Sequence, residues 1–212
     1  IPFLLTIIVG KKRLPADQVN EADGLKEISE EAKAGAADGM GNAVMREKGV
    51  SQSIAGELTA FLSGKAIPLA EVGDGVFSEG IMGDGMAIIP ETETVYAPVD
   101  AEVSVLMPQS RHACGLRLEN GMEILLHIGI DTVGMNGDGF EYLVQEGQRV
   151  SAGTPLIQFD RAKIRAAGHP DVTVCIVTEE GNAQNIQFRT GIDVIKKETT
   201  IAVFESYRGI GK

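Results

Sequence analysis

From residue 53 onward, short apolar runs alternate with glycine-containing turns, and this alternation most constrains how the chain can fold. Three Gly-Asp-Gly triplets, at residues 73–75, 83–85 and 137–139, interrupt the runs. Each triplet predicts a turn more readily than an anion-binding loop. Regularly spaced short strands with glycine turns are typical of sandwiches and barrels. We therefore predict an all-β fold, a compact antiparallel β-sandwich or barrel-sandwich with only short helical turns.

The strands are expected where apolar residues cluster between these turns. A dense apolar run at 54–63 opens the region, and the expected strands cover 66–72, 95–107, 114–118, 122–130, 149–159, 172–178 and 199–204. One or two helical turns are expected at 161–167. Cys114 and Cys175 fall within apolar runs, which predicts buried free thiols. Two cysteines in 212 residues are too few for a disulfide framework, so a reducing cytosol is expected.

The first 52 residues have a different character. Residues 1–9 are apolar and are followed by Lys11, Lys12 and Arg13, but a bilayer span needs about 20 residues. The pattern resembles the cytoplasmic end of a membrane helix, with a short amphipathic or disordered leader as the alternative. Residues 15–52 are rich in Ala, Gly, Glu and Lys. They predict a linker that is helical in part, with residues 25–33 as the candidate helix.

The formal net charge of −11 restricts the classes of partner. Nucleic acid and anionic lipid are disfavoured, because both require a basic surface. The charge instead suits an acidic docking face for a basic protein. The chain has three histidines, and His169, in the turn-like segment 167–170, is interpreted as a surface residue.

The other two histidines, His112 and His127, flank a predicted β-hairpin. Asn120-Gly121 is the strongest short-range signal for a two-residue turn, which would pair Glu119 with Met122. In that register the two histidines lie on one sheet face as diagonal neighbours, roughly 7–8 Å apart at Cα. A three-residue turn would shift the pairing by one residue and move His127 to the other face.

Spacing alone leaves three interpretations of this pair open. The imidazoles can be a structural pair within a sheet. They can ligate a metal, although no His-x-His or Cys-x-x-Cys sequence supplies a further ligand. They can also transfer a phosphoryl group, with one imidazole as nucleophile and the other holding the phosphoryl oxygens. The chain has no Gly-x-x-x-x-Gly-Lys-Ser/Thr loop for a nucleotide.

The segment Leu126-His-Ile-Gly-Ile-Asp-Thr-Val133 resembles the phosphorylation-site signature of the glucose-type enzyme IIA family. These proteins are components of the bacterial phosphoenolpyruvate-dependent sugar phosphotransferase system. Further blocks resemble the family in the family's order, at 74–90, 96–100, 110–113 and 146–150. The resemblance covers roughly residues 53–205 and is highly specific, because five ordered blocks take part in it.

The resemblance implies a compact antiparallel β-sandwich and a role for each residue of the pair. His127 is implied to be the residue phosphorylated by the phosphocarrier protein HPr, and His112 the histidine that supports it. Ser110 stands where the family carries a hydroxyl that bonds to the second histidine. The phosphoryl group would then pass to a cysteine of an enzyme IIB domain and from there to a sugar, with no cofactor and no metal.

Partner docking would need an apolar rim around the histidines with acidic residues beside it. The family blocks place Val76, Phe77, Ile81, Met82 and Val133 in the rim, with Asp74 and Asp131 meeting basic side chains of the carrier. Ordinary core packing is the alternative for each apolar residue. One departure is visible, because residues 107–110 replace a stretch that contains an aromatic residue in some members.

The resemblance also implies a place in a larger protein, since such modules are often fused behind a membrane-embedded enzyme IIC. Residues 1–14 are then the expected tail of that membrane domain and 15–52 the linker. The phosphocarrier domain is expected at 53–205 and a tail at 206–212. The parent would be an enzyme II of the sucrose, β-glucoside or trehalose type, with this module cytoplasmic, at the inner face of the cell membrane.

Two other functions fit parts of the pattern. Segments 97–103 and 147–153 resemble the half-motifs of biotinyl and lipoyl carrier domains, but no lysine lies between residues 97 and 153 to carry the cofactor. A zinc-dependent hydrolase on a similar β scaffold would need a His-x-His pair and an acidic ligand, and the former is absent.

Overall fold

The computed structural model of the chain describes residues 53–207. The expected membrane-domain tail at 1–14, the linker at 15–52 with its candidate helix, and residues 208–212 lie outside the described residues. Within the described part, no helix has the length and apolar character needed to cross a membrane.

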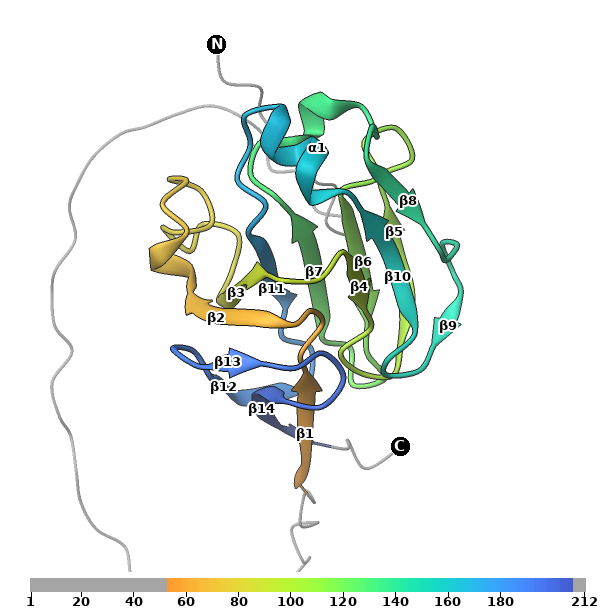
Figure 1. Ribbon diagram of the computed structural model, residues 1–212. Helices are drawn as coiled ribbons and strands as arrows, with labels where there is room; N and C mark the ends of the chain where they lie inside the picture. Colours follow the sequence, from red (N-terminus) through yellow and green to blue (C-terminus); the bar gives the residue numbers. More distant parts are fainter. Residues whose placement is uncertain (1–52, 208–212) are drawn as a thin grey trace, which may run out of the picture. The chain divides into compact units, whose positions relative to one another are not determined.

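Three antiparallel sheets make up the described region, which confirms the all-β prediction (Figure 1). The largest has eight strands in the order β13-β2-β3-β11-β7-β6-β5-β9, and two three-stranded sheets have the orders β1-β14-β12 and β4-β10-β8. The strands are β1 (Ser53–Thr59), β2 (Gly64–Pro68), β3 (Gly85–Pro90), β4 (Thr94–Tyr96), β5 (Ala101–Leu106), β6 (Ala113–Arg117), β7 (Glu123–Ile128), β8 (Phe140–Tyr142), β9 (Arg149–Val150), β10 (Pro155–Phe159), β11 (Thr173–Glu179), β12 (Ala183–Phe188), β13 (Asp193–Val194) and β14 (Thr200–Tyr207). The helices are α1 (Arg161–Ala166) and two 3-10 helices, Leu69–Glu71 and Thr132–Met135.

Most expected strands are present, but two of them are divided by turns. The expected strand 95–107 is split into β4 and β5, and 149–159 is split into β9 and β10 by a turn in which Gly153 has a φ of 82°. The sequence does not predict β3, β8, β12 or β13. β3 escapes prediction because it begins inside a Gly-Asp-Gly triplet, and β12 because its amide-rich sequence lacks an apolar cluster.

The eight-stranded sheet buries its two faces in different hydrophobic clusters. Leu126 and Ile128 of β7 face the main core, while His127 between them points to the opposite face, because side chains alternate along a strand. Cys114 and Cys175 also belong to the main core and are free thiols, as predicted. The second cluster consists of Ile67, Leu69, Phe77, Ala87, Val174 and Ile176.

The β6–β7 hairpin has a three-residue loop, so the predicted two-residue turn is wrong. Leu118 N–H donates to the carbonyl of Met122 at 2.8 Å, and Gly121 N–H donates back to Leu118 at 3.0 Å. Gly121 has a φ of 84°, as expected when a three-residue loop ends in a glycine bulge. The pairing is therefore shifted by one residue, and Ala113 rather than Cys114 is the cross-strand partner of His127.

A tertiary contact accounts for this loop. Asn182 N–H donates to the carbonyl of Asn120 at 2.9 Å, and a Cβ on Gly181 would lie 2.3 Å from the backbone of Gly121. The hairpin loop is thus seated against the turn between β11 and β12, which favours the longer loop over the two-residue turn.

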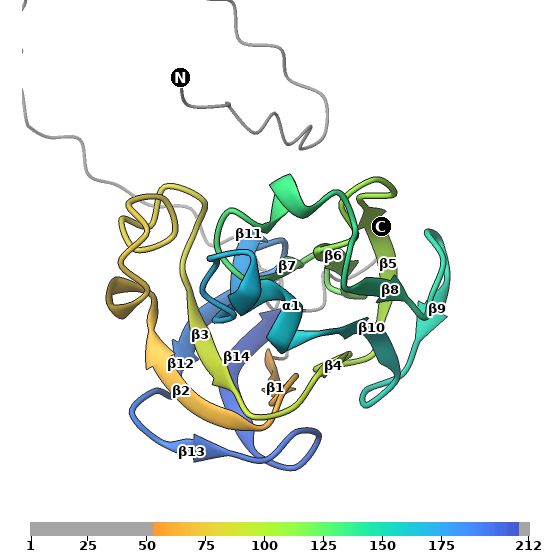
Figure 2. The ribbon, with the colours of Figure 1, turned by 45° about the horizontal axis from the view of Figure 1, so that its top comes forward.

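α1 and the segment that follows it lie at the end of the large sheet where β7 finishes (Figures 1 and 2). Beyond β7 the chain turns at Gly129, which has a φ of 73°, and enters the 3-10 helix Thr132–Met135. This end of the sheet therefore combines the last residues of β7 with two short helical segments.

Candidate functional site

His127 is the next-to-last residue of β7 and is held by strands on both sides. Its cross-strand partners are Ala113 on β6 and Val174 on β11. The side chain is only 5% exposed. Phe77 packs against the imidazole with the ring centroids 5.0 Å apart. Phe77 is buried, so it forms a wall beside His127, and its predicted part in the docking rim stays a prediction.

His112 lies against His127, although the observed register alone would place the two on opposite faces. The ring centroids are 4.5 Å apart and the rings are nearly perpendicular, at 82°. His112 precedes the first residue of β6, and Arg111 before it has a φ of 53°, so the chain has not yet entered the regular strand. The predicted proximity of the imidazoles is present, but it arises from this irregular entry and not from a shared sheet face.

The predicted hydrogen bond between Ser110 and His112 is not formed. Both ring nitrogens of His112 and Nδ1 of His127 are buried and have no hydrogen-bond partner among the described residues. Ser110 itself is buried, two residues before His112. The pair therefore presents three unpaired imidazole nitrogens in an apolar setting, which is unusual because buried polar atoms are nearly always paired.

Burial keeps both imidazoles neutral. It lowers the pKa of His112 to about 4. For His127, burial and then the neighbouring His112 lower the pKa to about 3, while the Gly129 backbone and the Asp74 carboxylate act in the opposite direction. A neutral imidazole keeps the nitrogen lone pair that a nucleophile or a ligand needs.

This neutrality predicts that the protein loses stability on acidification. A buried histidine with a lowered pKa binds fewer protons in the folded than in the unfolded state, so the free energy of unfolding falls below pH 6.5. The loss continues until the folded imidazoles titrate, near pH 4 and pH 3. Urea unfolding at pH 7, 6 and 5 measures it, and a His112→Gln, His127→Gln double variant should lose less. Imidazole NMR signals of either residue that titrate near pH 6.5 would contradict this prediction.

The backbone after His127 is held in place by several hydrogen bonds. Gly129 N–H donates to Val172 at 3.0 Å, Ile130 N–H donates to Pro170 at 3.1 Å, and the Thr132 hydroxyl donates to Ile128 at 2.6 Å. Glycine is required at 129, because a Cβ there would lie 2.4 Å from the methyl group of Thr132. The sequence did not single out Thr132, and only its place within the resemblance to the enzyme IIA signature pointed to it.

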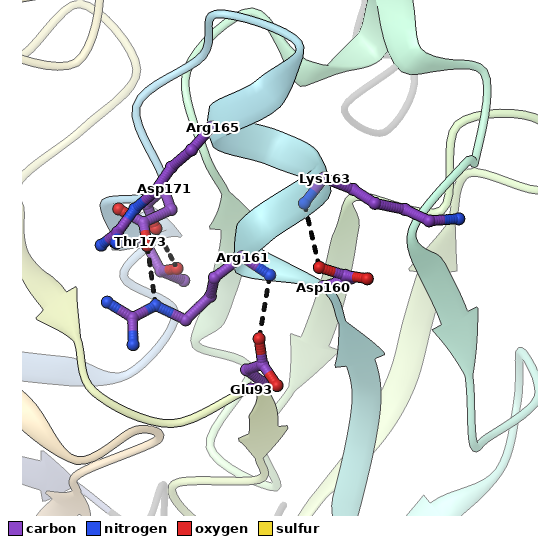
Figure 3. Close-up of polar contacts among 7 residues, drawn as sticks. All are labelled: Glu93, Asp160, Arg161, Lys163, Arg165, Asp171 and Thr173. Atoms are coloured by element: carbon purple, nitrogen blue, oxygen red, sulfur yellow. Dashed lines mark hydrogen bonds and ion pairs between the residues drawn. The ribbon is translucent and has the colours of Figure 1, made fainter.

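The segment that supports Gly129 and Ile130 is itself anchored to α1 by a buried carboxylate (Figure 3). One oxygen of Asp171 accepts from Arg161 Nε at 2.7 Å and from Arg165 Nη2 at 2.9 Å.

The start of α1 is held by two further carboxylates. Glu93 accepts from the backbone N–H of Arg161 at 3.1 Å, and Asp160 caps the helix through Lys163 N–H at 2.9 Å. Sequence analysis missed this cluster, since its members become neighbours only through the fold.

Asp171→Asn is expected to lower the free energy of unfolding by about 1–2 kcal/mol, because both ion pairs lose their charge while the two arginines remain partly solvated. Urea denaturation measures the change. The matched control is Asp138→Asn, which removes the exposed ion pair with Lys163 and should have no measurable effect. Equal losses in the two variants would contradict an anchoring role for Asp171.

Several of the residues predicted to form the docking rim are exposed. Val76, Ile81 and Val133 are 47%, 69% and 48% exposed, as expected of a docking rim, and Met82 is half-buried. Asp131 is exposed, at a φ of 58°.

Asp74 has a structural role of its own. It accepts hydrogen bonds from the backbone N–H groups of Val76, Phe77 and Ser78 at 3.0–3.3 Å. Burial acts to raise the pKa of Asp74, but these backbone bonds outweigh it and lower the pKa. Asp74 is thus a stable negative charge that also shapes the turn beneath the rim.

The remaining sequence candidates are His169 and a possible metal site. His169 is half-buried in the loop after α1. Within residues 53–207 no three histidine, cysteine, aspartate or glutamate side chains are placed to hold a metal ion together. Two hollows of about 590 and 550 Å³ contain neither His112 nor His127.

Two comparisons with known proteins bear on this site. Residues 56–183 match the sequence family described as phosphoenolpyruvate-dependent sugar phosphotransferase system, EIIA 1. The chain is also similar to a solved structure, glucose permease IIA from Mycoplasma capricolum, with 32% sequence identity and a TM-score of 0.64. That match covers 71% of this chain and 96% of the other.

Proposed function

The chain belongs to the EIIA 1 family of the phosphoenolpyruvate-dependent sugar phosphotransferase system, and on that premise we propose that His127 carries the phosphoryl group. Members of this family act as phosphocarriers in sugar transport and interact with HPr and with enzyme IIB. The observation that carries the proposal is the pair of neutral, buried imidazoles whose ring centroids lie 4.5 Å apart.

Nε2 of His127 is the proposed acceptor atom. Nδ1 is buried without a partner, which leaves Nε2 as the ring nitrogen that can face an incoming group. The lone pair on Nε2 forms the new N–P bond as the bond to the donor breaks, and the electron pair of the broken bond stays with the donor. Phosphohistidine is labile, so positioning and electrostatics carry most of the catalysis.

His112 is the proposed stabiliser of the transferred group. It is fully buried and neutral, and its unpaired nitrogens leave an N–H free to donate to a phosphoryl oxygen. Because this donor is already in place, no free energy of solvent reorganisation is needed when charge develops on the phosphoryl group. Ser110, buried two residues away, is a candidate partner for His112 in the phosphorylated state.

HPr is the proposed donor and a cysteine of enzyme IIB the proposed acceptor. The exposed side chains of Val76, Ile81 and Val133 would form the apolar part of the docking surface, with Met82 partly covered beside them. Asp74 and Asp131 would meet basic residues of the carrier, which suits the net charge of −11.

The larger arrangement is also a proposal. Residues 53–205 would be the phosphocarrier domain and 15–52 a linker to a membrane-embedded enzyme IIC, of which 1–14 would be the tail. The apolar residues 1–9 and the three cationic residues that follow support this reading. The module would then work at the inner face of the cell membrane.

Phosphoryl uptake from phosphoenolpyruvate, through purified enzyme I and HPr, tests the proposed function. We expect stoichiometric labelling that is lost in acid, as is typical of phosphohistidine. A folded protein that accepts no phosphoryl group from HPr would overturn the proposal.

A further inference from the structure

The loop that carries Ser110 and His112 is closed at its base by a tyrosine from another sheet. Tyr142 is the last residue of β8, which belongs to the sheet β4-β10-β8. Its hydroxyl accepts a hydrogen bond from Met107 N–H at 2.8 Å and donates one to the carbonyl of Ala113 at 2.5 Å. One oxygen atom therefore joins the two ends of the segment 107–113.

The Tyr142 hydroxyl replaces a backbone pair that is absent between β5 and β6. Leu106 pairs with Cys114, so the next pair in this register would be Met107 with Ala113. The strands diverge there, and the phenol bridges the backbone donor on one side and the backbone acceptor on the other. Ala113 is also the cross-strand partner of His127, so the bridge ends next to both histidines.

His112 has no side-chain hydrogen bond that could hold its ring in place. Neither ring nitrogen has a partner, and the predicted bond to Ser110 is not formed. Its position therefore depends on backbone hydrogen bonds and on packing against His127. Ile128 N–H donates to the His112 carbonyl at 2.8 Å, and Arg111 N–H donates to Met107 at 2.8 Å within the loop. The first bond ties the His112 backbone to β7, and the loop sets how the residue approaches it.

We propose that Tyr142 is a positioning residue, which fixes the His112 loop so that the two imidazoles meet at the separation that phosphoryl transfer requires. The inference rests on the proposed function of the histidine pair and adds to it a residue that touches neither the phosphoryl group nor its acceptor. Because the Tyr142 hydroxyl holds both ends of the loop, the loop needs no hydrogen bond from Ser110 to His112.

The chemistry of the phenol suits this role. Burial, the largest influence, raises the pKa of Tyr142 to about 12, with the Cys114 thiol acting in the same direction and the Met107 N–H and Arg111 opposing it. The hydroxyl is therefore protonated at every pH at which the protein works and keeps its donated bond to Ala113.

Tyr142→Phe tests the proposal, because it keeps the ring and removes only the two hydrogen bonds. The matched control is Tyr96→Phe on β4 of the same sheet, whose ring contacts Lys196 and Lys197 and not this loop. Three measurements on the full chain compare the variants: NMR titration of the His112 imidazole, single-turnover rates of uptake from phospho-HPr and of discharge to enzyme IIB, and urea unfolding.

For Tyr142→Phe we expect the pKa of His112 to rise from about 4 toward 6.5 as the loop loosens and admits water. Discharge should slow by roughly tenfold, because small displacements of a positioned group have large effects on rate. Uptake should change much less, and Tyr96→Phe should match the wild type in all three measurements.

Values for Tyr142→Phe that equal those for Tyr96→Phe, in both the His112 titration and the discharge rate, would overturn the positioning role. A slower discharge with an unchanged His112 pKa would overturn it as well, because the effect would then not act through His112. If the wild type accepts no phosphoryl group, the proposed function fails, and the titration alone decides whether Tyr142 holds His112.

Discussion

His127→Ala is expected to accept no phosphoryl group from phospho-HPr, a loss of at least about a thousandfold in uptake. The substitution removes Nε2, the nitrogen proposed to form the N–P bond, and the only other imidazole beside it, His112, is fully buried. Acid-labile radiolabel from phosphoenolpyruvate, transferred through enzyme I and HPr, measures the uptake.

Two further variants separate loss of the acceptor from loss of the fold. His127→Gln keeps more of the buried volume and should also be inactive, while His169→Ala, changed in the loop after α1, should take up phosphate as the wild type does. Circular dichroism shows whether each variant is folded. Acid-labile uptake that survives in folded His127→Ala would place the acceptor elsewhere.

His112→Ala is expected to accept the phosphoryl group but to pass it on about a hundredfold more slowly. The variant retains the proposed nucleophile, His127, and removes only the N–H proposed to stabilise the phosphoryl oxygens. Single-turnover experiments measure the two steps separately, first the uptake from phospho-HPr and then the discharge to enzyme IIB.

His112→Gln distinguishes hydrogen bonding from simple packing, because its amide can still donate a hydrogen bond within the buried site. We expect its discharge rate to lie between those of the wild type and His112→Ala. If His112→Ala failed at uptake instead of discharge, the assignment of His127 as nucleophile and His112 as stabiliser would be wrong.

The two histidine predictions and the Tyr142 prediction describe one chain of causes. In the proposed scheme, the Tyr142 hydrogen bonds fix the loop, the loop positions His112 against His127, and His112 stabilises the group that His127 would carry. Tyr142→Phe should therefore resemble a mild form of His112→Ala and should never resemble His127→Ala. This ordering of effects can be read directly from the uptake and discharge rates.

The sequence by itself determined the fold class and identified the histidine pair. Short apolar runs between glycine turns predicted the antiparallel sheets, because alternation and turn chemistry are local properties of the chain. The segment 126–133 also supplies the glycine that the structure needs at position 129. The turn after β7 has a positive φ there and no room for a Cβ. Family membership followed from the same segments.

The pairing register was decided by tertiary structure. Asn120-Gly121 allows either a two-residue or a three-residue loop, and the contact with Gly181 and Asn182 favours the longer one. That contact joins residues about sixty positions apart in the chain, so no local rule could supply it. The shift by one residue also changed which faces the histidines would occupy.

Tertiary structure likewise decided how the site is built. Phe77 is buried against His127, and His112 reaches its partner through an irregular entry to β6. The Tyr142 hydroxyl binds Met107 and Ala113, which lie 35 and 29 residues away. Sequence patterns describe which residues a strand presents, whereas contacts of this range depend on how sheets pack, and packing alone brings these side chains within reach of one another.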